Sequence, residues 1–197
     1  MTVLKNLLLA SVAVFSASAV EIASPDGKIV ADVAAKGAVL GYSIAADGQT
    51  VLPFSALGLA FDGKVSKEPV SIRGEGVIRT IDESYELIGN QPQHRNRCRE
   101  AVLTIAAGSS SYTLVVRVYN DGVAVRYLLP ENVAAVTGEA TSWTLPENAG
   151  KVVWAGLSQC YEGYTYHTRA SDIPAGKPFL GPVTVEAGRF FLVFSEA

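Results

Sequence analysis

The stretch from Tyr112 to Pro130 decides the fold, and it reads YTLVVRVY, then NDG, then VAVRYLLP. Two apolar runs rich in β-branched residues flank Asn120-Asp121-Gly122, a turn signal whose glycine tolerates the positive φ that other L-residues resist. This pattern predicts a β-hairpin closed by a three-residue loop.

Each arm of the predicted hairpin carries one arginine, Arg117 and Arg126, among residues that would otherwise be fully buried. A guanidinium keeps its charge, so each of these side chains must reach water, an acid or a ligand. The plainest interpretation is a structural ion pair. We therefore expect an acidic partner within the same sheet.

Length and composition bound the class of protein. The chain has 197 residues, enough for one well-buried domain and short for two. Its hydrophobic fraction of 49% excludes a disordered chain. The formal net charge of -3 leaves no basic footprint, so we expect no nucleic-acid partner.

The segment from Met1 to Ala19 has the composition of a secretory signal peptide. Lys5 supplies a positive start, Leu7–Phe15 an apolar run, and Ala17-Ser18-Ala19 a small-residue cleavage site. The apolar run is short for a membrane span, and no later segment could cross a bilayer. We expect an exported mature protein that starts at Val20, is periplasmic or extracellular, and has no membrane partner after cleavage.

Export permits disulfides, and the chain has two cysteines, Cys98 and Cys160. The sequence leaves their pairing open, because it cannot place their Cα atoms within bridging distance. We expect two separate buried thiols. His94 and His167 are far apart in the chain and neither cysteine has a metal-ligand spacing, so we expect no zinc site.

Short alternating runs separated by Asp-Gly, Asn-Asp-Gly and Ala-Gly turns recur along the chain, and no amphipathic helix interrupts them. Such a pattern is typical of an antiparallel β-sandwich or barrel, and sequence alone does not choose between them. The expected strands are Ile29–Ala34, Val39–Ala45, Thr50–Pro53, Leu57–Phe61, Val70–Ile72, Val77–Ile81, Ser84–Leu87, Arg99–Ala106, the two arms of the hairpin, Thr141–Leu145, Lys151–Ala155, Val183–Val185 and Arg189–Phe194.

Two surface features invite a functional interpretation. Arg95, Arg97 and Arg99 alternate and would share one face of a strand, which we interpret as a solvated strand end. The predicted loop Gln159–His167 contains three tyrosines, which are candidates for stacking on sugar rings but could equally pack an interface or cover a sandwich edge. These candidate carbohydrate-binding residues are Tyr161, Tyr164 and Tyr166.

The hairpin segment R-V-Y-N-D-G-V-A-V-R-Y resembles R-x-Y-x-D-G-x-A-F-R-Y in the N-terminal domain of glycoside hydrolase family 97. Asn96–Glu100 departs from the family ending N-x-Y-N-E, which puts in doubt any sugar contact made there in relatives. Further similar segments follow in the family's order and span nearly all of Val20 to Ala197. They are Ser24–Lys28, Leu57–Leu59, Trp143–Pro146, Trp154, Tyr161-Glu162, Pro178-Phe179, Pro182–Glu186 and Val193–Ala197.

The resemblance implies an all-β fold, an antiparallel β-supersandwich of the galactose-mutarotase type. Family members continue into a (β/α)8 barrel and cleave α-glucosides or α-galactosides in an exo fashion with an active-site calcium ion. Their catalytic carboxylates lie on that barrel, so the resemblance implies no catalytic residue here and a domain, residues 20–197, that is truncated and inactive alone. Glu196 matches the one calcium-ligating glutamate that the N-terminal domain supplies.

The implied partners are an α-linked oligosaccharide or glycoside and the absent catalytic barrel. A lone carboxylate provides one of the roughly 6–8 oxygens that calcium takes, so we expect no tight calcium binding by this chain. Two alternatives stay open. One is a stand-alone carbohydrate-binding sandwich, and the other is a mutarotase-like epimerase, which would need a histidine acid and a carboxylate base in one cleft.

Overall fold

The computed structural model describes residues 19–61, 63–108, 110–129, 131, 136–156, 163–176 and 178–196. Within these residues no helix is long and apolar enough to cross a membrane. Strands dominate, with one short 3-10 helix, η1 (Ala170–Asp172). The strands are β1 (Ala19–Ala23), β2 (Ile29–Lys36), β3 (Val39–Ala46), β4 (Gln49–Leu57), β5 (Leu59–Phe61), β6 (Lys64–Val65), β7 (Val70–Glu86), β8 (Gln93–Ala107), β9 (Ser110–Val118), β10 (Val123–Leu128), β11 (Val136–Glu139), β12 (Ala149–Gly156), β13 (Thr165–Arg169), β14 (Phe179–Ala187) and β15 (Phe190–Phe194).

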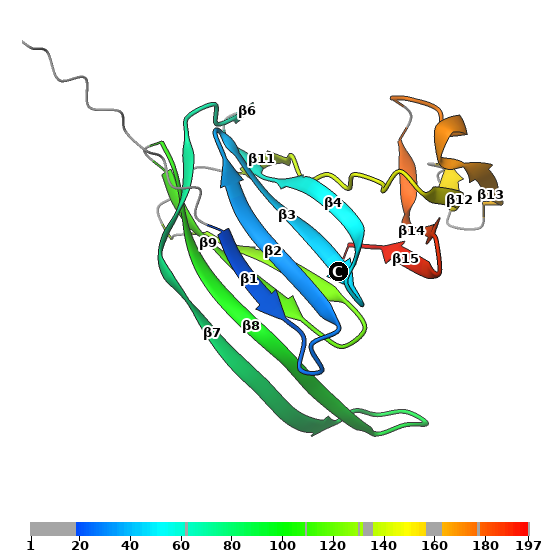
Figure 1. Ribbon diagram of the computed structural model, residues 1–197, viewed down its shortest axis with the longest axis horizontal. Coiled ribbons are helices and arrows are strands. Elements are labelled where there is room, and N and C mark those ends of the chain that lie inside the picture. Colours follow the sequence, from blue (N-terminus) through cyan, green and yellow to red (C-terminus); the bar gives the residue numbers. More distant parts are fainter. Residues whose placement is uncertain are drawn as a thin grey trace, which may run out of the picture.

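Two four-stranded antiparallel sheets form a sandwich (Figure 1). One is the meander β1-β2-β3-β4, and the other has the order β10-β9-β8-β7. Alternation along the strands turns one face of each sheet inward: Leu40 and Tyr42 of β3 are buried, and so are Leu103 and Ile105 of β8. The core between the two sheets contains fifteen buried residues, which makes the sandwich the stable centre of the chain.

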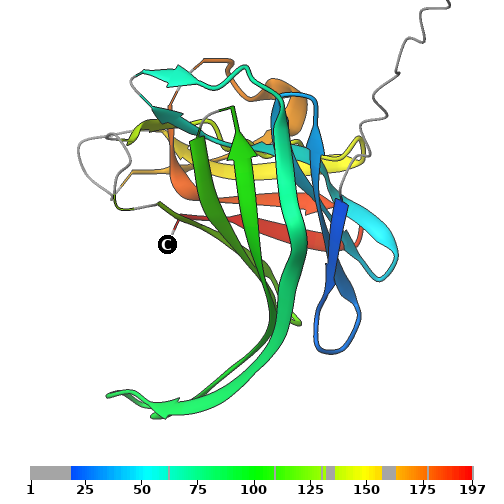
Figure 2. The same cartoon turned by 90° about the vertical axis from the view of Figure 1, so that its left-hand side faces the viewer.

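β7 is one long strand, although the sequence predicts three short strands broken by glycine. β7 pairs with β8 from Val70↔Ala107 to Glu86↔Gln93, with a single register shift between Arg73 and Val77. Gly74 lies inside that irregularity with φ 72°, so a bulge absorbs the glycine without ending the strand. β7 and β8 continue beyond β9 as a curved two-stranded ribbon (Figure 2).

The central hairpin forms as predicted, with β9 and β10 paired from Thr113↔Leu128 to Val118↔Val123. Its loop differs from the prediction. Four residues separate the strands, and the Tyr119 N–H donates to the Gly122 carbonyl at 2.8 Å. Gly122 does not have the expected positive φ. The loop is held from outside, because the Asn120 side-chain oxygen accepts from the Asp26 N–H at 3.1 Å.

The predicted strand Thr141–Leu145 is wrong, because this segment runs beside β4 with few ladder bonds. The Ser142 N–H donates to the Ala56 carbonyl at 2.9 Å, but the Thr144 N–H bonds to the side chain of Ser55, also at 2.9 Å. A hydroxyl replaces a carbonyl, so no regular strand results. β11, which was not predicted, pairs with β5 in a small sheet of order β11-β5-β6.

Another four-stranded sheet, called the second sheet from here on, lies to one side of the sandwich (Figure 1) and has the order β13-β12-β14-β15. β13 begins within the predicted loop Gln159–His167, whose residues 159–162 lie outside the described part of the chain. Among the described residues, the buried core of this second sheet consists of Val152, Val183 and Val185. Phe194 packs against both this cluster and the sandwich core, so β15 joins the two regions.

The architecture confirms the predicted all-β antiparallel fold. In the described residues two sheets pack face to face, so the fold is a sandwich and not the barrel that the sequence also allowed. Cys98 is buried with a free thiol, as expected, and Cys160 lies outside the described residues.

Candidate functional site

Glu196 follows the last strand and is exposed at the rim of a cavity of about 400 Å³. Trp143 and Phe179 line the cavity with aromatic rings, and Phe194 and Ser195 of the same chain end lie beside them. We call this space the Trp143 cavity. It combines apolar walls with one carboxylate, the mixture common in small-ligand sites.

The backbone around Trp143 is fixed on the edge of β4. The Ala56 N–H donates to the Ser142 hydroxyl at 3.1 Å, and the Thr144 hydroxyl donates to the Phe54 carbonyl at 3.1 Å. These bonds flank the tryptophan on both sides. The position of its side chain is therefore set by the sandwich.

The indole itself has two defined contacts. It stacks on Phe194 with ring centroids 5.1 Å apart and an interplanar angle of 27°. Its other neighbour is Tyr42: burial raises the pKa of this tyrosine, and the adjacent Trp143 side chain opposes the rise. Trp143 nevertheless remains 37% exposed. The exposed part of the indole is thus held in a fixed orientation at the cavity.

The opposite wall belongs to the second sheet. Phe179 lies edge-on to Trp154 with centroids 6.4 Å apart, and Tyr166 stacks on Trp154 at 4.8 Å. The Trp154 indole N–H donates to the Thr168 hydroxyl at 3.1 Å, which fixes the central ring. Phe179 keeps 44% of its surface exposed, so it faces the cavity from a supported position.

The three predicted sugar-stacking tyrosines have different environments. Tyr161 lies outside the described residues. Tyr164 is 93% exposed, and Tyr166, the cover of Trp154, is 52% exposed. The structure therefore brings no second ring beside Tyr164 within the described residues, and the proposed role of these tyrosines in sugar binding stays a prediction.

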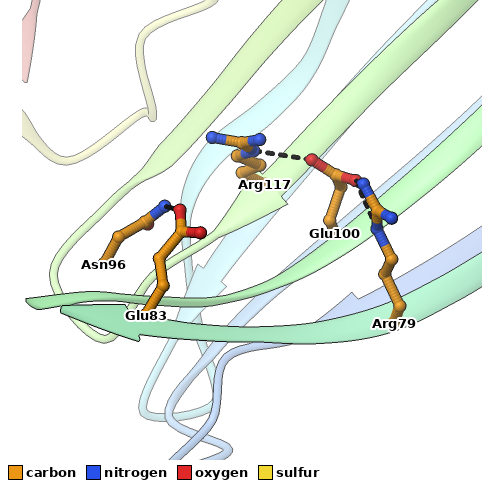
Figure 3. Close-up of polar contacts among 5 residues, drawn as sticks. All are labelled: Arg79, Glu83, Asn96, Glu100 and Arg117. Carbon is orange, nitrogen blue, oxygen red and sulfur yellow. Dashed lines mark hydrogen bonds and ion pairs between the residues drawn. The ribbon is translucent and has the colours of Figure 1, made fainter. Parts of the chain in front are cut away.

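The sequence analysis expects an acidic partner for the hairpin arginines, and Glu100 is that partner. It is buried on β8, between β7 and β9 (Figure 3). Register places Arg79 of β7 and Arg117 of β9 directly opposite Glu100. Each guanidinium reaches one carboxylate oxygen at 2.7 Å. The expected ion pair within the sheet is confirmed for Arg117, whereas Arg126 is exposed to solvent.

Electrostatics explain why this carboxylate is tolerated inside the fold. Burial would raise the pKa of Glu100, but hydrogen bonds from Arg117 and Arg79 outweigh it and hold the pKa below its ordinary value. The bond to Glu100 raises the pKa of Arg117 in turn. Since one carboxylate pairs with a guanidinium on each adjacent strand, the cluster clamps β7, β8 and β9 together.

The basic stretch forms part of the projecting β7–β8 ribbon. Arg95 makes two hydrogen bonds of 2.7 Å to Asp82 across the ribbon, and Arg97 lies 3.7 Å from the same carboxylate. Asn96 donates to Glu83 at 2.6 Å on the other face (Figure 3). Arg95 and Arg97 are exposed, as the solvated-end prediction has it, but Arg99 is only half-exposed and its Nε is buried.

The histidines do not form an acid–base pair in the described part of the chain. His94 lies on β8 and stacks on Tyr85 at 5.7 Å, and His167 lies on β13. Both histidines therefore lie on strands. Neither hydrogen-bonds to a carboxylate among the described residues, and these residues contain no cluster of three or more metal-ligating side chains.

The described residues thus define an all-β antiparallel sandwich with a second sheet beside it. The chain belongs to the glycosyl-hydrolase 97 N-terminal family, whose model matches residues 22–197. A relative from Streptomyces bingchenggensis (strain BCW-1), named "Probable retaining alpha-galactosidase", is 34% identical over 119 residues. That alignment covers 59% of this chain and 18% of the relative.

Solved structures share the fold at low sequence identity. A beta-arabinopyranosidase matches with a TM-score of 0.79 and 20% identity, over 88% of this chain and 31% of its own. A glycoside hydrolase family 97 enzyme from Pseudoalteromonas sp. strain K8, in complex with panose, matches with a TM-score of 0.73 and 20% identity, over 86% of this chain and 27% of its own. The chain thus spans less than a third of these matched proteins.

Proposed function

We propose that this chain is the N-terminal domain of a calcium-dependent, exo-acting α-glycosidase of the glucosidase or galactosidase type. The domain packs on a catalytic barrel, supplies Glu196 as one calcium ligand, and has no hydrolytic activity alone. The family match supports the assignment as an N-terminal domain, and the named activity of the Streptomyces relative supports the substrate class. The proposed route is secretory, with Met1–Ala19 as the signal and a periplasmic or extracellular destination.

The observation that carries this proposal is the position of Glu196. Its carboxylate is exposed beyond the end of β15, outside both cores, where a neighbouring domain can reach it. A carboxylate is a fitting calcium donor because calcium is a hard cation held by oxygen ligands. Glu186 lines a different cavity and Glu100 is committed to two arginines, so Glu196 is left free for an external partner.

When bound, calcium would supply charge stabilisation near the sugar that is cleaved. This chain's part is to present the Glu196 carboxylate at a fixed place on the second sheet. Thr184 of β14 pairs with Val193 of β15, and Val183 with Phe194, which sets the direction in which the chain leaves the sheet. The barrel would contribute the other protein ligands and the catalytic carboxylates.

The test is to join this domain to the barrel of the Streptomyces relative and to titrate calcium. The joined protein should hydrolyse p-nitrophenyl α-galactoside, and Glu196→Gln should weaken calcium binding by about tenfold or more and lower turnover. Glu186→Gln is the matched control, because it also lies beside β15 but is not proposed as a ligand.

The isolated chain provides the complementary measurement. We expect neither hydrolysis nor a calcium-dependent rise in melting temperature, because one exposed carboxylate leaves most of the coordination shell to water. Tight calcium binding by the isolated chain, or a joined protein whose calcium affinity ignores Glu196→Gln, would contradict the proposal.

A further inference from the structure

We propose that the outer edge of β15 binds a second copy of this chain, and that the two copies pair antiparallel through Phe190–Phe194. The pairing would join the second sheets of two copies into one continuous sheet with a two-fold axis between them. This inference goes beyond the proposed function, because it needs neither calcium nor a catalytic barrel.

The first argument is that this edge of the second sheet is unpaired. β15 is the outermost strand in the order β13-β12-β14-β15 (Figure 1), and among the described strands it pairs with β14 alone. Every residue from Phe190 to Ser195 lines a cavity of about 240 Å³ between β15 and the sandwich. Since side chains of a strand alternate between its two faces, all of them can line one cavity only along the strand's edge. The edge of β15 therefore opens on unfilled space and is accessible to another strand.

The second argument is that β15 lacks the features that keep free edges from pairing, which are charged side chains, prolines and bulges. Its sequence is FFLVF, and its ladder with β14 has no register shift. The other outer strands of the described four-stranded sheets are protected. β1, β7, β10 and β13 carry charged residues, and β4 is covered by the backbone around Trp143.

The third argument is that the strand is complementary to itself. Antiparallel pairing centred on Leu192 places Phe190 opposite Phe194 of the second copy, and Phe191 opposite its Val193. Phe191 and Val193 are 74% and 63% exposed in the single chain, so the pairing covers apolar surface that is otherwise open to water. Aromatic and β-branched side chains that lie directly opposite each other stabilise antiparallel ladders.

The charges at the ends of β15 agree with this pairing. The paired residues are uncharged, and the two-fold axis brings Arg189 before the strand in one copy near Glu196 beyond the strand in the other. Opposite charges therefore meet at both ends of the interface. Because the same edge is used by both copies and is then occupied, the assembly closes at a dimer.

The first measurement is sedimentation velocity of the purified full chain over concentrations from about 1 to 500 μM. A chelator is present, so that calcium cannot bridge two copies through Glu196. We expect a monomer–dimer equilibrium with a Kd of about 10–100 μM, weak because a short strand buries less surface than a standard protein–protein interface. A chain that stayed monomeric at every concentration would reserve the edge for a different partner and would overturn the proposal.

Variants then test the strand and its register. Val193→Lys places an ammonium group opposite Phe191 of the second copy and should weaken the dimer about tenfold or more. Val77→Lys is the matched control, because Val77 is 65% exposed on β7 and the substitution there should leave the Kd unchanged. Phe191→Glu should weaken the dimer like Val193→Lys. The double variant Phe191→Glu/Val193→Lys should recover much of the affinity, since each new carboxylate then faces a new ammonium group across the two-fold axis.

Hydrogen exchange of the unmodified chain keeps the proposal testable if a variant fails to fold. Amides of β15 should exchange more slowly at high than at low protein concentration, whereas those of β10, an outer strand of the sandwich, should not change. Equal Kd values for Val193→Lys and Val77→Lys, a double variant no tighter than the single variants, or β15 exchange that ignores concentration would each contradict the proposed pairing. None of these measurements involves calcium binding or the barrel, so this proposal and the proposed function can fail separately.

Discussion

The sandwich and the second sheet are built from strands of similar composition, but they bury very different cores. The sandwich encloses fifteen residues between two sheets, and the second sheet encloses three. β15 of the second sheet presents Phe191 and Val193 with 74% and 63% of their surfaces exposed. The comparison indicates that, among the described residues, the sandwich is stabilised by a much larger buried core than the second sheet.

The two regions are joined at few places, which limits how strongly they can share stability. Phe194 packs on both cores, and Arg189 forms an ion pair of 2.9 Å with Asp47 in the β3–β4 turn. The Asp47–Arg189 pair is exposed and worth little. Glu196 lies at this junction, shortly after β15.

The largest effect is expected in the sandwich core. Leu103→Ala removes a fully buried side chain and should lower the free energy of unfolding by about 2–5 kcal/mol. Val185→Ala removes two methyl groups from the small core and should cost about 1.5 kcal/mol, confined to the second sheet. Denaturant unfolding checks this, with circular dichroism reporting the whole chain and fluorescence reporting Trp143 and Trp154 near the second sheet.

If Val185→Ala lowered the main circular-dichroism transition as much as Leu103→Ala, the regions would be one cooperative unit. Coincident curves from both probes in the unmodified chain would argue the same way.

The next effect concerns charge. Glu100→Gln should cost about 3 kcal/mol at neutral pH, because it leaves Arg79 and Arg117 without their shared anion. The folded-state pKa of Glu100 is lowered, so its contribution is complete above the unfolded pKa near 4.5 and is lost as the pH falls through the folded value. The difference between variant and unmodified protein should therefore shrink in acid.

Asp82→Asn is the control, since it breaks an exposed pair on the β7–β8 ribbon and should change the melting temperature only slightly. A Glu100→Gln penalty that stayed constant down to strongly acidic pH would contradict the assigned clamp.

The smallest effect is expected at the hairpin tip. Gly122→Val should change stability by about 0.5 kcal/mol or less, because Gly122 lacks a positive φ and has open space around its Cα. Gly41→Ala should cost about 1–3 kcal/mol, since a Cβ there would lie 2.4 Å from the Phe54 ring and 2.6 Å from the Ser55 carbonyl oxygen. Thermal melts of the two variants give the ranking, and equal losses would refute it.

Gly122 also shows where sequence reasoning stops. The Asn-Asp-Gly signal locates the turn, but the Asn120 contact to the distant Asp26 backbone selects a loop in which the glycine needs no special conformation. In β7, local glycine signals predict breaks that a bulge removes through pairing with β8. Alternation and turn residues therefore predicted most of the sandwich strands, and long-range pairing decided their lengths.

The candidate site was likewise predictable from the sequence only in part. Family resemblance identifies Glu196, and simple charge reasoning predicts an acid for Arg117. The Trp143 cavity could not be predicted, because Trp143 and Phe179 meet through packing of a segment on β4 against a separate sheet. One sequence feature could have pointed to the cavity. Trp143 lies between Ser142 and Thr144, whose hydroxyls hydrogen-bond to the backbone of β4.

The long β7–β8 pairing has a kinetic consequence. A short turn closed by Leu87 and Pro92 joins the two strands, so their pairing can propagate from neighbouring residues with little loss of chain entropy. The β5–β11 pairing instead joins Phe61 to Val136 and must close a long loop. We expect refolding to begin with β7, β8 and β9, and pulse-labelled hydrogen exchange should show amide protection there before it appears in β5.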